Sequence, residues 1–143
     1  MHQFLLGNVA GMPVWVFAVL FVVSGAFLIW PEIMRLAGAS NEIGTLEATR
    51  LLNQGTTLVL DVREPAEFAA GHLPKARNIP LRELERRVGE IGKYKERTVL
   101  VTCRSGPRAG SASRVLKRAG FATVYMLKGG LNAWQQASLP VEK

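Results

Sequence analysis

Cys103 begins a short run of residues that is typical of a nucleophile in an anion-binding loop. The run reads C-R-S-G-P-R and contains the only cysteine of the chain. Two arginines favour negative charge near the thiol, and the small Ser105 and Gly106 allow backbone N–H groups to point at the sulfur. Such surroundings favour the nucleophilic thiolate without a separate general base. The predicted catalytic residue is Cys103, and the predicted anion-binding loop comprises Arg104, Ser105, Gly106, Pro107 and Arg108.

The elements around this loop predict where it lies. Residues 98–102 (T-V-L-V-T) form an apolar run of strand length, and residues 109–119 show the apolar spacing of a helix that stops at Gly120. Ligands of open α/β sheets bind where strands end, and a helix start attracts anions. The competing interpretation is a small buried cysteine with no chemistry. The flanking arginines favour the first interpretation.

The remaining pattern alternates strands with helices. Helices are predicted over 45–53, 65–70, 131–136 and a stretch from Leu81 to Ile91, and strands over 57–62 and 123–126. The strands are apolar on both faces, which is typical of a parallel sheet covered on both sides. The predicted class is therefore α/β, a parallel sheet with helices on both faces, in a domain over about residues 41–143.

An apolar segment precedes this domain. Between Val14 and Trp30 only Ser24 and Gly25 are not apolar, and a helix of 18–22 residues spans a hydrocarbon core of about 30 Å. We expect Pro13 to start this helix and Pro31 to help stop it. Residues 1–40 are thus predicted to be a transmembrane anchor and linker, with the span at about 13–30 and in contact with membrane lipid.

Two alternatives to a membrane anchor remain open. A signal peptide would fit the A-G-A sequence at 37–39, although no basic residue precedes the apolar run, and a buried core helix would need a larger domain. Basic residues follow the span at Arg35 and Arg50 and none precedes it. The positive-inside rule then predicts a single-pass protein of the inner (cytoplasmic) membrane with its C-terminal domain in the cytoplasm.

Charge and composition exclude several classes of function. The net charge is +7, and it favours anionic substrates or surfaces. Nucleic acid is not expected as a partner, because the basic pairs at 86–87 and 117–118 lie on solvated helix faces without interleaved aromatic residues. One cysteine allows no internal disulfide. With only His2 and His72 beside it, no metal site is expected.

Four stretches in the domain resemble the rhodanese superfamily in order and spacing. They are D-V-R-E-P-A-E-F-A-A-G-H-L-P (61–74), A-R-N-I-P (76–80), V-T-C-R-S-G-P-R-A (101–109) and L-K-G-G-L-N-A-W (127–134). The resemblance covers about residues 41–143 and implies a rhodanese fold. It also implies that Cys103 accepts sulfane sulfur as a persulfide, from a small anionic donor such as thiosulfate. A thiol, cyanide or a protein would be the acceptor, and no cofactor or metal would be needed.

Loop length and one substitution qualify the resemblance. Related phosphatases have five residues between the cysteine and the arginine, whereas four separate Cys103 from Arg108 here, which favours sulfur transfer over phosphate hydrolysis. Lys75 stands where many relatives have glycine, which affects one turn. Two other functions stay open: a phosphatase, and a membrane-anchored sulfur carrier or adaptor with little turnover.

Other polar residues near the motifs are expected to support the structure. Asp61 and Arg63 follow a buried strand, and we expect an ion pair that orders nearby loops. His72 is expected in a turn that packs the domain rather than in catalysis. The Gly-Gly pair at 129–130 predicts a tight turn, and Trp134 is expected in the core.

Overall fold

The structure is a computed structural model that describes residues 8–9, 11–38 and 41–143. The chain divides into two compact units, Met1–Ala39 and Ser40–Lys143. In the first unit, strands β1 (Asn8–Val9) and β2 (Met12–Pro13) pair antiparallel and lead into helix α1 (Val14–Gly38). Within the described residues, α1 is the one helix long and apolar enough to cross a bilayer.

Between Val14 and Pro31, helix α1 exposes its apolar side chains. An 18-residue window, Val14–Pro31, has a mean hydropathy of 2.2, and none of it is buried. The expectation that Pro31 helps to stop this helix is wrong, because α1 runs through Pro31 to Gly38. The residues after the proline, E-I-M-R-L-A, are mostly strong helix formers, which favours continuation of the helix although proline lacks a backbone N–H. The region from 31 to 38, expected as a linker, is therefore helical.

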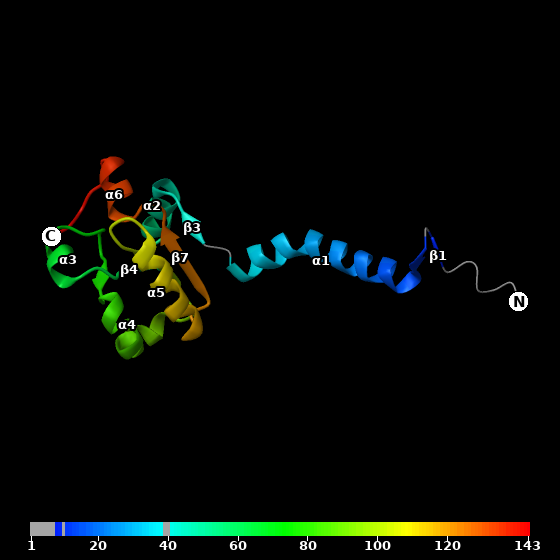
Figure 1. Cartoon of the computed structure of the whole chain (residues 1–143). Coiled ribbons are helices and arrows are strands. Elements are labelled where there is room, and N and C mark those ends of the chain that lie inside the picture. The colour runs from blue at the N-terminus through cyan, green and yellow to red at the C-terminus, as the bar shows by residue number, and fades with distance from the viewer. Residues whose placement is uncertain (1–7, 10, 39–40) are drawn as a thin grey trace, which may run out of the picture. The chain divides into compact units, whose positions relative to one another are not determined.

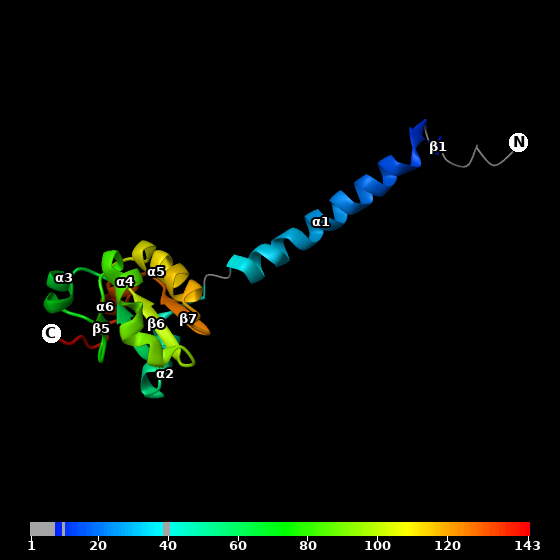
Figure 2. The same cartoon turned by 90° about the horizontal axis from the view of Figure 1, so that it is seen from below.

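A five-stranded parallel sheet forms the centre of the second unit (Figures 1 and 2). Its order is β3-β7-β6-β4-β5. The strands are β3 (Glu42–Ile43), β4 (Leu58–Asp61), β5 (Arg77–Asn78), β6 (Thr98–Thr102) and β7 (Thr123–Leu127). Every pairing between neighbours is parallel, so the loops that follow β4 and β6 leave the same edge of the sheet.

Helices cover both faces of this sheet, as the alternating sequence pattern predicted. They are α2 (Thr45–Asn53), α3 (Pro65–Ala70), α4 (Leu81–Arg87), a 3-10 helix η1 (Val88–Tyr94), α5 (Pro107–Arg118) and α6 (Gly130–Gln136). One core cluster joins α4, η1 and α5 to side chains such as Leu60 and Val101. The other joins α2 and α6 to Val59 and Leu100, which point to the opposite face.

Differences from the expected elements fall where local signals are weak. The two-residue strands β3 and β5 were not predicted, because so short a segment shows no periodicity. The amphipathic stretch from Leu81 to Ile91 is two elements, since the α-helix ends at Arg87 and η1 follows. Gly89 and Gly92 lie in η1, and glycine is a poor α-helix former.

Candidate functional site

The loop from Cys103 to Gly106 joins the end of β6 to the start of α5. Gly106 precedes the helix with a φ of 132°, in a region that favours glycine, and Pro107 occupies the first turn. The backbone N–H of Gly106 donates a hydrogen bond to Cys103 Sγ at 2.9 Å. The predicted inward-pointing amide is therefore present at Gly106.

Cys103 is more enclosed than the basic sequence around it suggests. Its exposed fraction is 1%, and it packs with the core cluster beneath α5. Arg104 and Ser105, by contrast, are exposed. A reagent therefore reaches the sulfur only through a narrow opening or after a movement of the loop.

Arg108 contacts an acid that the sequence analysis did not identify. Its guanidinium donates two hydrogen bonds to the Glu67 carboxylate, Nη1 to Oε1 at 2.7 Å and Nη2 to Oε2 at 3.0 Å. These bonds lower the pKa of Glu67 to about 2, against the opposing effect of burial. The same bonds raise the pKa of Arg108, and the nearby Cys103 and Asp61 contribute to this increase. The pair is ionised at every physiological pH.

Glu67 also organises the start of α3. Its side chain accepts a hydrogen bond from the Glu64 N–H at 3.2 Å, and the Glu64 side chain in turn accepts one from the Glu67 backbone, which completes a capping box. The E-P-A-E sequence predicts the start of a helix. It holds no signal of Arg108, 41 residues away. Only the fold brings these two side chains together.

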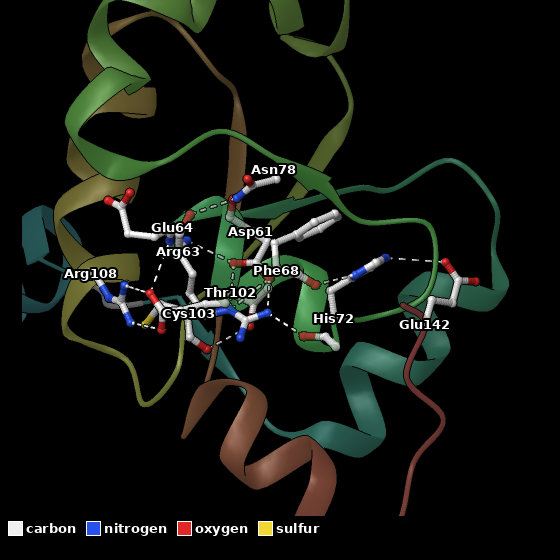
Figure 3. Close-up of polar contacts among 12 residues, drawn as sticks. Asp61, Arg63, Glu64, Phe68, His72, Asn78, Thr102, Cys103, Arg108 and Glu142 are labelled. Atoms are coloured by element: carbon white, nitrogen blue, oxygen red, sulfur yellow. Dashed lines mark hydrogen bonds and ion pairs between the residues drawn. The ribbon is translucent and has the colours of Figure 1, made fainter.

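The expected ion pair between Asp61 and Arg63 is present and buried (Figure 3). Arg63 Nη2 lies 2.7 Å from Asp61 Oδ2 and also donates to the Gly71 carbonyl oxygen at 2.7 Å. The Asn78 side chain donates to the Asp61 and Arg63 carbonyl oxygens at 3.1 and 2.8 Å. This network ties the end of β4 to β5 and to the end of α3.

Helix α6 supports the Cys103 loop from a distant part of the sequence. The Leu131 N–H donates to the Cys103 carbonyl oxygen at 2.8 Å, and the Asn132 N–H donates to the Arg104 carbonyl oxygen at 3.1 Å. Gly129 and Gly130 have φ of 74° and 57°, which gives the expected tight turn. A Cβ on Gly130 would collide with the carbonyl group of Cys103. Glycine is therefore needed here for close approach of the two backbones.

His72 and Trp134 lie where the sequence analysis expected structural roles. The His72 ring stacks on Phe68 at a centroid distance of 3.7 Å, and its Nδ1 lies 2.9 Å from the Phe68 carbonyl oxygen (Figure 3). Its backbone also pairs with Glu142. The Trp134 side chain is buried and donates to the Pro140 carbonyl oxygen at 2.8 Å. The His72–Glu142 backbone pairing and the Trp134–Pro140 hydrogen bond hold the C-terminal segment against the domain.

A cleft with a volume of about 250 Å³ opens beside the loop. Residues from α3, from α6 and from the loops that follow β4 and β6 line it, among them Arg63, Glu67, Arg104, Leu131, Asn132 and Gln135. Five of these six residues, all but Gln135, make the contacts described above, and they meet at the carboxyl edge of the sheet. Among the residues that the structure describes, no group of three His, Cys, Asp or Glu side chains has the arrangement of a metal site.

Comparisons with known proteins agree with this geometry. The sequence matches the family profile of the Rhodanese-like domain over residues 45–137. The chain is 38% identical over 92 residues to a protein of Allochromatium vinosum named "Sulfurtransferase", an alignment that covers 64% of this chain and 84% of that protein. It is 36% identical over 96 residues to the uncharacterized protein YibN of Escherichia coli K12, covering 66% of this chain and 67% of YibN.

A solved structure shows the same fold. The crystal structure of a protein from Lactobacillus plantarum superposes with a TM-score of 0.64 at 30% identity, and the match covers 80% of this chain and 99% of that one. The parallel sheet and the helices on both of its faces thus have a known counterpart. The chain belongs to the rhodanese-like domain family.

Proposed function

We propose that this protein is a sulfurtransferase that carries a sulfane sulfur on Cys103 as a persulfide. The observation that carries the proposal is the 2.9 Å hydrogen bond from the Gly106 N–H to Cys103 Sγ, in a loop flanked by Arg104 and Arg108. An N–H donor aimed at sulfur stabilises negative charge on it. The Gly106 N–H and the two guanidinium groups stabilise first the anionic sulfur-donating substrate and then the persulfide.

The proposed reaction has two half-reactions on one sulfur atom. The Cys103 thiolate attacks the outer sulfur of the donor, forms a new S–S bond and expels the remainder of the donor, which is sulfite if thiosulfate is used. A nucleophilic acceptor then attacks the outer sulfur of the persulfide, and the electron pair of the broken S–S bond returns to Cys103. No electron carrier is needed, and the order of events predicts ping-pong kinetics.

The enclosure of Cys103 favours this chemistry over disulfide exchange. Cys103 has an exposed fraction of 1%, so little space surrounds its sulfur, and this favours the slim end of a sulfane chain over a bulky disulfide. The donor class that fits is therefore a small anion with a terminal sulfur, and thiosulfate is the simplest example. The positive charge of the domain surface attracts such anions.

Turnover of thiosulfate with cyanide tests the proposed function. The purified protein should form thiocyanate, and initial rates at varied concentrations of both substrates should give parallel double-reciprocal lines. Cys103→Ser should abolish turnover, because an alkoxide is much harder to form than a thiolate. Hydrolysis of phosphate esters with no thiocyanate formed would contradict the proposal and favour the phosphatase. Sulfur uptake without turnover would instead favour the carrier function.

We further propose that α1 anchors the protein in the inner membrane as a single-pass helix. The support is an outward-facing apolar window, Val14–Pro31, that matches the thickness of a bilayer core. Arg35 and Arg50 follow this window, whereas the residues before it carry no Lys or Arg, and under the positive-inside rule this pattern predicts a C-terminal domain in the cytoplasm.

Two measurements test the anchor and its orientation. After a carbonate wash, the full-length protein should remain with the membrane fraction, and its appearance in the soluble fraction would contradict the anchor. A reporter fused after Lys143 should be active in the cytoplasm. Activity in the periplasm alone would overturn the orientation, and a cut after Ala39 would show that the segment is a signal peptide.

A further inference from the structure

The cleft beside the Cys103 loop contains one cation that has no acidic partner. Of its charged side chains, Arg63 is held by Asp61 and the Gly71 carbonyl, and Glu67 is held by Arg108. Arg104 makes no ion pair and no side-chain hydrogen bond within the described part of the chain, and it is exposed. Its guanidinium therefore keeps five N–H donors free for a ligand.

The part of the cleft that α6 lines is neutral and polar. Asn132 and Gln135 are exposed on α6, three residues apart and so on the same face of the helix. Their amides both donate and accept hydrogen bonds. Leu131 and Ala70 add apolar surface to the same cleft. The lining thus suits a small organic molecule with an anionic end rather than a simple inorganic anion.

Backbone hydrogen bonds join α6 to the Cys103 loop. The Leu131 and Asn132 N–H groups donate to the carbonyl oxygens of Cys103 and Arg104, so the α6 side of the cleft is held next to Arg104. The volume of about 250 Å³ lies just below the lower end of the range for pockets that hold drug-sized ligands, about 300 Å³. A ligand in this cleft lies beside the residue that follows the reactive sulfur.

We propose that this cleft binds the sulfur acceptor, and that the acceptor is a small organic thiol whose carboxylate is bound by Arg104. The proposal rests on the proposed function of Cys103. A planar guanidinium matches a carboxylate with two parallel hydrogen bonds, which gives both strength and orientation. Asn132 and Gln135 then contact the remainder of the molecule and leave its sulfur free to reach the loop.

The transfer step needs no further reactant. The acceptor thiolate attacks the outer sulfur of the Cys103 persulfide and forms an S–S bond in the acceptor. The S–S bond to Cys103 breaks, and its electron pair stays on Cys103 as thiolate. The acceptor leaves as an organic persulfide, so atoms and charge balance.

A comparison of three thiols of similar size tests the proposal. The detergent-solubilised full chain is treated with excess thiosulfate, the gain of one sulfur atom is verified by intact mass, and the donor is removed. Loss of that sulfur is then followed with 3-mercaptopropionate, 2-mercaptoethanol or cysteamine at equal thiolate concentrations. The carboxylate thiol should discharge the wild-type protein fastest and the cationic thiol slowest.

Variants of Arg104 assign the preference to the cleft. Arg104→Gln should slow discharge by 3-mercaptopropionate about 10-fold more than discharge by 2-mercaptoethanol, the effect of one lost charged hydrogen bond to the carboxylate. Arg104→Lys should retain part of the preference. Arg114→Gln removes the same charge from an exposed position on α5 and should behave as the wild type.

Three results would overturn the proposal. The first is equal discharge rates of the wild-type protein with all three thiols. The second is a loss by the same factor in all three rates for Arg104→Gln. The third is an effect of Arg114→Gln as large as that of Arg104→Gln. A wild-type protein that never gains sulfur would overturn the proposed function and this inference with it. The two failures are distinguishable, because the gain in mass is measured before any thiol is added.

Discussion

Arg108 ends the Cys103 loop with its guanidinium bound at both Nη atoms by Glu67. Replacing it with alanine removes a charged donor near the sulfur and leaves Glu67 as an unpaired negative charge in the cleft. We expect Arg108→Ala to reduce thiosulfate turnover by about 10- to 150-fold, which corresponds to about 1.5–3 kcal/mol. Arg82→Ala is the matched control, because Arg82 pairs with Glu64 on an exposed surface.

A double variant separates the two causes of that loss. If the unpaired Glu67 repels the anionic donor, Arg108→Ala combined with Glu67→Gln should be more active than Arg108→Ala alone. Turnover of the wild type, of Arg108→Ala, of Glu67→Gln and of the double variant gives the coupling free energy between the two side chains. Equal losses for Arg108→Ala and Arg82→Ala would show that the charge at the loop has no specific effect.

The Glu67–Arg108 pair also predicts a dependence of stability on pH. The folded pKa of Glu67 is about 2, below the ordinary 4.5, so the pair stabilises the fold above pH 4.5 and this contribution is lost as the pH falls toward 2. Glu67→Gln should therefore melt at a lower temperature than the wild type at neutral pH, and the difference should disappear near pH 2. A difference that is constant over this range would contradict the assignment.

A control for this measurement comes from another carboxylate. Glu96 makes no ion pair within the residues that the structure describes, and it is exposed. Glu96→Gln should change the melting temperature little at either pH, since isolated surface charges contribute little to stability. A shift equal to that of Glu67→Gln would indicate a general charge effect.

Single residues near Cys103 could be predicted from the sequence to different extents. The C-R-S-G-P-R run indicated a loop with an amide directed at the Cys103 sulfur, and D-V-R indicated the Asp61–Arg63 ion pair; both are present, whereas the role of Cys103 as nucleophile stays a prediction. Glu67 could not be connected with Arg108 in this way, because the contact depends on how α3 and α5 meet at the edge of the sheet. The near-complete burial of Cys103 is likewise a property of packing that its charged neighbours in sequence do not indicate.

At the scale of elements, the Gly129-Gly130 turn sets the distance between α6 and the loop. An alanine at position 130 would need a φ near 57° and would collide with the Cys103 carbonyl, so Gly130→Ala should destabilise the fold by at least about 1–2 kcal/mol. It should also reduce turnover by moving the loop. Chemical denaturation and thiocyanate formation measure the two effects.

Gly89 provides the matched control for that substitution. It lies in η1 with open space where a Cβ would be added, and its φ is not in the left-handed region. Gly89→Ala should be neutral or should stabilise the fold by about 0.4–1 kcal/mol. If both variants lost the same stability, the close approach at Gly130 would not be the cause.

Elements with a strong periodic pattern were predicted well. The helix over 45–53 and the strand over 98–102 have the expected bounds, because each pattern is long and is terminated by a clear signal. Strands β3 and β5 are two residues long and exist only through pairing with β7 and β4. Helix α1 continues past Pro31, so a single proline did not mark the end of this helix, and the residues that follow it are mostly strong helix formers.

At the scale of the whole molecule, the chain combines an apolar helix with a rhodanese-like domain. The fold class and the family follow from sequence motifs, and both are confirmed. The membrane location stays a prediction that rests on α1 alone. Function depends on whether the Cys103 sulfur accepts a second sulfur atom, since catalysis, carriage and the proposed acceptor cleft all require it.

Intact mass spectrometry of the protein treated with thiosulfate alone tests this claim most directly. Without an acceptor, the first half-reaction should stop at the persulfide, so the wild-type protein should gain the mass of one sulfur atom and lose it again when cyanide is added. Cys103→Ser should gain nothing under the same conditions. An unchanged mass of the wild-type protein with thiosulfate and with other sulfane donors, or an equal gain in Cys103→Ser, would contradict the account.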